Sequence, residues 1–419
     1  MINNLHRKIA VLGCGPAGIV TALGLAKMGY NVCVIANVRR HNVTEGISER
    51  VYQSLSYLGV QHALKIVSSP IPRSVSWNGS HSAANTERLI RRVDFDIALL
   101  KDLADANIPF YDETILKVKK QNNQHCVLCK SGKDFVTDFI VEARGRAAPL
   151  TKSSHIKGSD SLSICQNWRI TQSSLSSPLM SPEAMAISIE NGWLWLANNG
   201  KGNIFTQVSI GAKSITGAAN AKLSSFIHKL VLTRPELAHI TPYIEPYGKV
   251  IARSSSPIFN KTPIEAGVLC VGDAAMSVDP LSGNGIFQSL SSALIAPVVI
   301  NTLFHKPENK VLAETLYTER LKHLFYRFSR IGRDFYKMES RWQQHPFWQE
   351  RCTWPDQQPA HQEQDRIISV VKRPVINGNF IEEKEVVITA EQPLGIWKIN
   401  NQNAIDVMSL QLKQLKLIS

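Results

Sequence analysis

The sequence is poor in cysteine and shows no cysteine pattern of a disulfide framework. Its seven cysteines are an odd number, scattered over 419 residues. This excludes a small, disulfide-rich secreted domain and favours a reducing compartment. Cys126 and Cys129 have CxxC spacing, but no second CxxC or suitably spaced histidine pair accompanies them. We therefore expect no metal site and no redox role for this pair.

Two further patterns are absent. No apolar run reaches the ~18 uninterrupted residues of a membrane-spanning helix. An apolar run over residues 9–26 follows three basic residues, but glycines and Pro16 interrupt it, which argues against a secretory signal. No Lys/Arg run with interleaved aromatic residues marks a nucleic-acid-binding face. We expect a cytoplasmic protein with no membrane span that does not bind nucleic acid.

Acidic residues are fewer than basic ones, 34 against 47, which gives a formal net charge of +13. Such a surface attracts anions. The excess suits either a generally basic soluble enzyme or a protein with an acidic partner. With 44% hydrophobic residues, a chain of this length exceeds the usual single core, so we expect two interleaved lobes.

The strongest pattern is a pair of glycine-bearing segments about 260 residues apart. The first, Gly13-Cys-Gly-Pro-Ala-Gly18, lies between an apolar run at 8–12 and a helical pattern at 17–28. In such a motif the first glycine permits a tight turn, the second lets backbone approach a pyrophosphate, and the third lets helix pack on strand. The helix N-terminus then attracts phosphate. The predicted contacts are Gly13, Gly15, Pro16, Ala17 and Gly18.

One part of a dinucleotide site is missing. The acid that should end the second strand and bind the adenosine ribose is replaced by Ala36-Asn37. Either backbone atoms or Asn37 serve the ribose, or Arg39 or Arg40 contacts a phosphate.

The second segment turns the prediction from a dinucleotide to FAD. Asp273 follows a predicted strand at 267–272, so its carboxylate can accept hydrogen bonds from ribityl hydroxyls, and Gly272 leaves room for the cofactor. Downstream, Asp279-Pro-Leu-Ser-Gly-Asn-Gly285 opens a long apolar helix over 285–303. Its N-terminal amides would face the flavin edge where negative charge accumulates on reduction. The predicted contacts here are Gly272, Asp273, Pro280, Gly283, Asn284 and Gly285.

A third segment follows the second predicted strand. Glu45-Gly46-Ile47 could wrap the isoalloxazine, and the nearby Arg50 either contacts the pyrophosphate or forms an ordinary surface ion pair. Ser48 is a candidate helix N-cap. Arg92, just before an amphipathic pattern at 94–106, is a similar candidate to Arg50.

Aromatic residues gather in two places. Trp193 and Trp195 lie on one face of a strand, where they either pack in the core or line a substrate cavity beside the flavin. Between residues 330 and 354, aromatic and arginine side chains are too dense for a solvated face. These side chains either pack helices together or form a surface that binds a partner.

The order of strand and helix patterns predicts an α/β fold with a Rossmann-like FAD-binding domain of the glutathione-reductase type. We expect this domain in residues 1–70, 94–155 and 255–330. A mixed β-sheet substrate domain, residues 71–93 and 156–254, is interleaved with it. Residues 331–419 form a C-terminal extension of helices and strands.

Four segments together resemble the single-component FAD-dependent monooxygenases of the aromatic hydroxylase and tryptophan halogenase superfamily. They are the first glycine motif, Arg92-Val-Asp-Phe95, Glu142-Ala-Arg-Gly145 and the Gly272–Gly285 segment. Within this superfamily, four segments resemble the flavoprotein maturases that oxidise a peptidyl tryptophan in quinone-cofactor amine dehydrogenases and lysine oxidase. These segments are residues 44–48, 142–149, 279–288 and 332–356. The length and the tail are similar to the maturase of quinohaemoprotein amine dehydrogenase.

The resemblance implies FAD reduced by NADH or NADPH, with O2 forming a C4a-hydroperoxide that hydroxylates an aromatic ring. The implied ring is a tryptophan in the acidic precursor subunit of an amine dehydrogenase, during biogenesis of cysteine tryptophylquinone. The resemblance also implies cofactor contacts from Arg144 and Gly145. No catalytic base is assigned; the substrate-cavity candidates are Trp193, Trp195 and Glu45.

Two alternatives stay open. One is a hydroxylase or halogenase of a small free aromatic compound, although the expected halogenase pattern Trp-x-Trp-x-Ile-Pro is not kept, because Leu-Ala-Asn follows Trp195. The other is a flavin-binding protein that only docks another polypeptide. The oligomeric state is not predicted.

Overall fold

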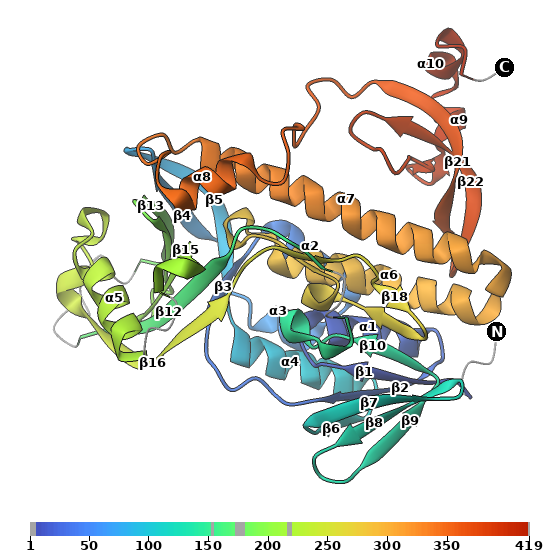
Figure 1. Ribbon diagram of the computed structural model, residues 1–419, viewed down its shortest axis with the longest axis horizontal. Coiled ribbons are helices and arrows are strands. Elements are labelled where there is room, and N and C mark those ends of the chain that lie inside the picture. The colour runs from blue at the N-terminus through green and yellow to red at the C-terminus, as the bar shows by residue number, and fades with distance from the viewer. Residues whose placement is uncertain (1–5, 152–154, 172–180, 216–219, 418–419) are drawn as a thin grey trace.

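The computed structural model describes residues 6–151, 155–171, 181–215 and 220–417. It confirms the predicted α/β fold, with a Rossmann-like sheet, a mixed sheet and a C-terminal extension (Figure 1).

The first layer is a six-stranded sheet in the order β18-β19-β10-β1-β2-β6. All neighbouring pairs are parallel except β18 with β19. The strands are β1 (Lys8–Leu12), β2 (Asn31–Ala36), β6 (Phe110–Asp112), β10 (Phe139–Glu142), β18 (Ile264–Glu265) and β19 (Val268–Cys270). Four successive residues of β1 and all of β10 are buried, as expected for strands covered on both faces. The pairing of β10 with β19 brings the distant third portion of the chain into this sheet.

Helices cover this sheet. They are α1 (Pro16–Lys27), α2 (Glu49–Leu58), α3 (Gln61–Lys65), α4 (Arg92–Asp105) and α6 (Gly285–His305). Helix α4 starts two residues earlier than its pattern predicts, directly after a strand ends at Arg91. Ser48 occupies the predicted N-cap position of α2, but its side chain makes no capping hydrogen bond to any described residue.

Helices α1 and α6 pack closely because Gly24 has no side chain. A Cβ at Gly24 would lie 2.7 Å from the Pro297 ring. By length and composition α6 could cross a membrane, but 78% of its most apolar window is buried inside the protein. Helix α6 is therefore a core helix, lying between α1 and the long α7 (Lys310–Lys337).

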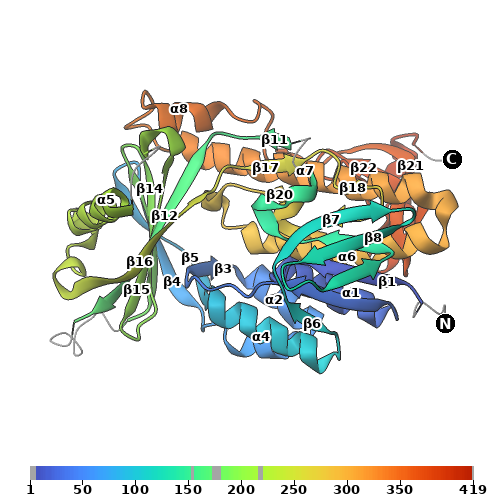
Figure 2. The same cartoon turned by 60° about the horizontal axis from the view of Figure 1, so that its bottom comes forward.

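The second layer is an eight-stranded mixed sheet in the order β16-β12-β15-β14-β13-β4-β5-β3, seen edge-on in Figure 2. Its strands are β3 (Thr44–Ile47), β4 (Ile71–Trp77), β5 (Ser80–Arg91), β12 (Ser161–Ile170), β13 (Glu183–Ile189), β14 (Gly192–Asn198), β15 (Asn203–Gly211) and β16 (Ile244–Ser254). Helix α5 (Asn220–Leu232) covers one face, where Leu194 and Leu196 pack against it. Trp193 and Trp195 point to the other face, as the period-two pattern predicts.

Two small sheets complete the body. One is the meander β7 (Ile115–Gln121), β8 (Gln124–Cys129) and β9 (Asp134–Thr137), in which residues 130–133 connect β8 to β9. The other joins β11 (His155–Lys157), β17 (Ile258–Asn260) and β20 (Met276–Ser277). Cys126 and Cys129 lie buried in β8 as free thiols.

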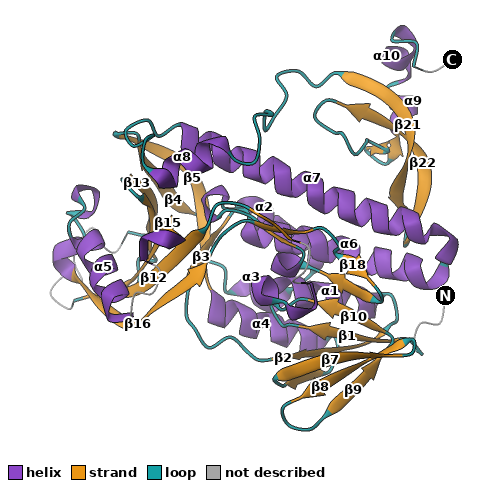
Figure 3. Ribbon diagram, in the orientation of Figure 1, coloured by secondary structure: helices purple, strands orange, loops and turns teal. Residues whose placement is uncertain are grey.

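The C-terminal extension lies along α7 (Figure 3). Its elements are α8 (Pro346–Thr353), the hairpin β21 (Ile367–Asn377) and β22 (Phe380–Thr389), the pair β23 (Lys398–Ile399) and β24 (Gln402–Asn403), α9 (Ala404–Val407) and α10 (Ser409–Gln414). The Ile381 N–H donates to Thr302 Oγ1 over 2.9 Å, and Lys306 pairs with Glu382 at 2.8 Å. These contacts fix the hairpin to the end of α6.

Candidate active site

The two glycine segments, far apart in the chain, touch one another. Gly272 has a φ of +59°, and a Cβ there would lie 2.8 Å from the Ala17 Cβ in the first motif. Its N–H donates to Ser292 Oγ of α6 over 2.8 Å. Gly13 has a φ of +124°, and a Cβ there would lie 2.4 Å from the Ala143 carbonyl oxygen. A side chain at Gly272 would separate the two glycine segments, and one at Gly13 would separate the first of them from the residues that follow β10.

On its other side the same region is open. Within the part of the chain that the structure describes, a Cβ at Gly15, Gly145, Gly283 or Gly285 would meet no atom within 4 Å. Helices α1 and α6 both begin here, and neither has a side-chain cap or an acidic residue in its first turn. Their free N–H groups and positive dipole ends therefore face the open side. This arrangement suits an anionic, phosphate-bearing ligand.

Charged side chains from three segments meet beside this opening. Asp273 follows β19, keeps 38% of its side chain exposed and lies 3.4 Å from Arg146 Nε. The pKa of Asp273 is raised. Burial is the main cause and Glu45 of β3 adds to it, against the opposing effect of Arg146. Glu45 in turn accepts a hydrogen bond from Arg92 over 2.7 Å. The predicted candidates Glu45, Arg92 and Asp273 thus belong to one electrostatic cluster.

Arg92 is held by carboxylates on both sides. Besides Glu45, its guanidinium contacts Asp96 at 3.1 Å, and Asp96 also pairs with Arg39 at 2.8 Å. The end of β2 is similarly occupied. The Asn37 side chain donates to Asp112 over 3.2 Å and accepts from Thr114. These contacts favour neither of the two alternatives for the missing acid.

Arg50 and Arg144 lie at the rim of the open region. The Arg50 guanidinium sits 5.2 Å from the centre of the Phe287 ring, in the first turn of α6. Within the described residues it forms no ion pair. Arg144 pairs with the fully buried Glu142 at 2.5 Å. Both cations are therefore placed near the predicted cofactor contacts.

The remaining predicted residues lie in β3 and in the loop before α6. Gly46 packs against β5 and β14, where a Cβ would lie 2.2 Å from the Glu87 carboxylate and 3.2 Å from the Trp195 ring. Ile47 is buried. Pro280 and Asn284 precede α6, and Asn284 is its N-cap.

The two tryptophans differ in their surroundings. Trp193 is 3% exposed and its indole N–H donates to the Tyr336 hydroxyl over 3.1 Å. That hydroxyl lies 3.1 Å from both carboxylate oxygens of Asp279. Burial raises the pKa of Asp279, against the opposing effect of Arg351. A polar chain thus joins the mixed sheet, α7 and the loop before α6.

Trp195 is half-buried and donates to Glu87 over 3.1 Å. Burial raises the pKa of Glu87, and Arg73 and Trp195 partly offset this effect. Sequence reasoning missed Glu87, Tyr336 and the hydrogen-bonding role of Asp279. Glu87 lies in a strand with an unremarkable pattern. Tyr336 lies in the aromatic and arginine cluster, which was predicted only as a whole.

Comparison with known proteins gives the family. The family model described as tryptophan halogenase matches residues 92–391, and one described as lycopene cyclase protein matches residues 8–159. A tryptophan 2-halogenase of Chondromyces crocatus is 22% identical over 394 residues, covering 85% of this chain and 71% of that protein.

Two solved structures extend the comparison. The peptidyl tryptophan dihydroxylase QhpG, essential for tryptophylquinone cofactor biogenesis, is 37% identical with a TM-score of 0.85, over 99% of this chain and 96% of that chain. CmlS, a flavin-dependent halogenase, is 14% identical with a TM-score of 0.78, over 99% and 93% of the two chains. These matches confirm the resemblance predicted from the motifs. The chain belongs to the tryptophan halogenase family.

Proposed function

We propose that this chain is an FAD-dependent monooxygenase that hydroxylates a tryptophan side chain within a protein, in the biogenesis of a tryptophylquinone cofactor. The contact between Gly272 and Ala17 carries the proposal, because it joins both predicted halves of the flavin site. The activity itself is that of the QhpG relative, which is similar over nearly the whole length of both chains.

The residues present fit FAD. The open side of Gly15 and the uncapped α1 N-terminus would hold the pyrophosphate. Asp273, partly exposed beside Arg146, would accept hydrogen bonds from the ribityl chain. Gly283, Asn284 and Gly285 would hold the flavin ring at the α6 N-terminus.

Bound FAD, reduced by NADH or NADPH, would activate O2 for transfer of one oxygen atom to the ring. For each oxygen inserted, one NAD(P)H, one proton and one O2 are consumed, and one NAD(P)+ and one water are formed. The α6 N-terminus would stabilise negative charge on the reduced cofactor.

The chain's own residues shape the substrate side. The hydrogen bonds among Trp193, Tyr336 and Asp279 hold this face of the mixed sheet against the loop before α6. Trp195 and Glu87 flank Gly46 on the same face. Their rigid placement would orient an indole ring and exclude water.

We further propose that the protein substrate is acidic and that the reaction takes place in the cytoplasm. The net charge of +13 supports the first, because it would steer an acidic partner. The seven free cysteines support the second.

The test is incubation of the FAD-loaded protein with the precursor subunit of an amine dehydrogenase, NADH and O2, followed by mass spectrometry. We expect the subunit to gain one or two oxygen atoms and to stimulate NADH oxidation. Stimulation by free indoles or phenols alone would instead support the small-aromatic alternative. A gain of chlorine or bromine in halide buffer would support halogenation, which family membership favours and the departure after Trp195 disfavours.

A further inference from the structure

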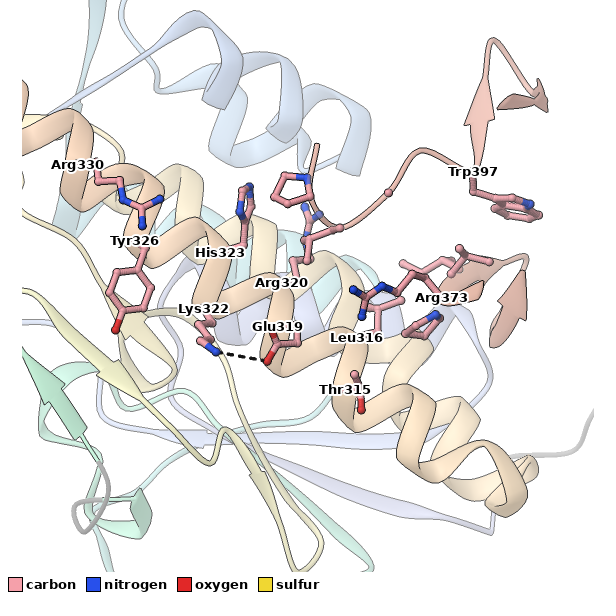
Figure 4. A pocket seen from close by; sticks show the side chains of 16 residues that line it. Thr315, Leu316, Glu319, Arg320, Lys322, His323, Tyr326, Arg330, Arg373 and Trp397 are labelled. Carbon is pink, nitrogen blue, oxygen red and sulfur yellow. Dashed lines mark ion pairs between the residues drawn. The ribbon is translucent and has the colours of Figure 1, made fainter. Parts of the chain in front are cut away.

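A cavity of about 470 Å³ lies outside the predicted flavin site, between α7 and the C-terminal extension (Figure 4). One wall is the α7 stretch from Thr315 to Arg330. The other is formed by residues 373–376 of β21 and by residues 393–397. In size it falls within the range of small-ligand pockets.

The far wall is fixed by packing. A Cβ at Gly395 would lie 2.3 Å from Val386 Cγ2, so this segment lies directly on β22. A bridge between Val387 and Ile396 holds it there. Trp397 packs with Val375 and Val386 in one apolar cluster. The cavity is thus bounded by ordered elements on both sides.

The lining carries an excess of positive charge. Four lining side chains are basic, Arg320, Lys322, Arg330 and Arg373, and one is acidic, Glu319, which lies 3.7 Å from Lys322. Arg330 is neutralised by Asp356 at 2.8 Å. Within the described residues, Arg320 and Arg373 form no ion pair.

Arg320 is the least satisfied of these cations. Its Nη2 donates to the Ser291 hydroxyl over 3.1 Å, but its buried Nε has no hydrogen-bond partner among the described residues. Burial lowers the pKa of Arg320. Burial lowers the pKa of the neighbouring His323, and Arg327 and Arg320 lower it further, against the opposing effect of Glu391. A cation withdrawn from water without a counter-ion is costly, so the cavity favours an anion.

The rest of the lining is apolar. Leu316, Val375, Leu394 and Trp397 contribute to it beside the guanidinium groups. A small inorganic anion would leave this surface uncovered. A peptide segment with an acidic residue next to an apolar one would satisfy both, since guanidinium binds carboxylate in a fork and the apolar side chain covers the wall.

The cavity is also separated from the flavin site. Figure 1 shows α7 running between the C-terminal hairpin and the Rossmann-like sheet, and α6 packs against α7 on its inner side. A ligand here would lie on the outer side of α7 and would not reach the open ends of α1 and α6.

We infer that this cavity is a docking site for an acidic segment of the protein substrate, distinct from the place where its tryptophan reacts. The inference rests on the proposed function. Binding one substrate at two places raises its effective concentration at the reaction site. The docking contact should therefore lower KM with little effect on kcat.

The test compares R373Q and R320Q/R373Q with the control K372Q in the FAD-loaded protein. Lys372 is exposed on β21 next to Arg373 and is not one of the residues that line the cavity, so K372Q removes the same charge outside it. The readouts are fluorescence anisotropy with labelled precursor subunit and the KM and kcat of its oxygenation.

We expect R373Q to weaken binding several-fold and the double variant about tenfold or more, with a matching rise in KM, less than a twofold change in kcat and wild-type behaviour for K372Q. Equal losses in all three variants, or no loss in any, would overturn the inference. R373Q changes an exposed residue, so it keeps the test valid should the double variant fold poorly. A wild-type protein that binds the subunit through these arginines but never oxygenates it would contradict the proposed function and leave the docking site supported. Normal oxygenation with an unchanged KM in the double variant would contradict the docking site and leave the proposed function supported.

Discussion

Gly272 has two constraints at one position. Its φ of +59° lies in the left-handed region, where a side chain costs about 1 to 2 kcal/mol. In addition, a Cβ would lie 2.8 Å from the Ala17 Cβ, which has no flexible end to move aside. The first constraint is common to many turns; the second is specific to the contact between the two glycine segments.

We predict that G272A lowers the free energy of unfolding by about 2 to 4 kcal/mol and weakens FAD binding at least tenfold. Gly59 provides the matched control, because its φ is +74° and a Cβ there would meet no atom within 4 Å. G59A should cost about 1 to 2 kcal/mol and leave FAD affinity unchanged. Urea unfolding and flavin titration measure both; equal FAD affinity in the two variants would contradict the proposed contact.

The residue scale is also where prediction from sequence falls short. Glycine patterns identified Gly13, Gly272 and their neighbours, because backbone requirements leave a local signal. Tyr336 and Asp279 are 57 residues apart and meet only through tertiary packing. Arg92 is predicted as a cofactor contact. Its pairing with Asp96 is a local i,i+4 contact within α4, whereas its pairing with Glu45 depends on how β3 and α4 pack, which no local pattern encodes.

At the scale of elements, a substitution at the α1 N-terminus is expected to change FAD affinity with little effect on folding stability. Gly15 has φ −76° and ψ 177°, which any residue adopts, and its Cβ position is empty. We predict that G15A changes the unfolding free energy of the cofactor-free protein by about 1 kcal/mol or less. The added methyl group would occupy space predicted for the pyrophosphate, so FAD affinity should fall at least tenfold. Wild-type affinity in G15A would show that this helix end does not hold the cofactor.

The end of α7 is tied to the turn between β4 and β5. Glu339, whose side chain is fully buried, accepts the Asn78 N–H over 2.8 Å and pairs with Arg341 at 2.8 Å. Burial alone would raise the pKa of Glu339, but the hydrogen bonds, first that from Arg341, outweigh it and lower the pKa to about 2. The structure thus stabilises the charged form.

Because the folded pKa is lowered from 4.5, this stabilisation is complete above pH 4.5 and is lost as the pH falls toward 2. We predict that E339Q is less stable than wild type by about 2 kcal/mol at pH 7, and that the difference shrinks steadily below pH 4.5. The exposed Glu383 of β22 serves as control, since E383Q should match wild type at each pH. A difference for E339Q that does not depend on pH would contradict this account. Urea unfolding at several pH values measures it.

Most elements were predictable because their patterns are local. Four strands of the mixed sheet, β12 to β15, follow local apolar patterns, and α1 and α6 were predicted from one apolar helix pattern each. The parallel pairing of β4 with the distant β13 has no local signal. In the tail, β21 and β22 pair over one long hairpin, whose register has no local signal. The segment boundaries of the two interleaved domains stay a prediction.

For the whole molecule, we propose that the two sheets position the tryptophan ring that reacts, while the C-terminal extension binds another part of the protein substrate. The extension contacts the body through α6 and α7, so a partner bound there is fixed relative to the flavin-binding sheet. Net charge alone would act at a distance and weaken uniformly with salt. A docking cavity adds a contact that depends on particular arginines.

The most direct measurement of the central claim uses isotopically labelled O2. The FAD-loaded protein, the precursor subunit and NADH are incubated under the labelled gas, and the subunit is digested and analysed by mass spectrometry. We predict that the gained oxygen carries the label, that it lies on a tryptophan, and that G15A reduces the gain at limiting FAD. A subunit that gains no oxygen while the wild-type protein binds FAD and oxidises NADH, or one whose gained oxygen comes from water, would contradict the account.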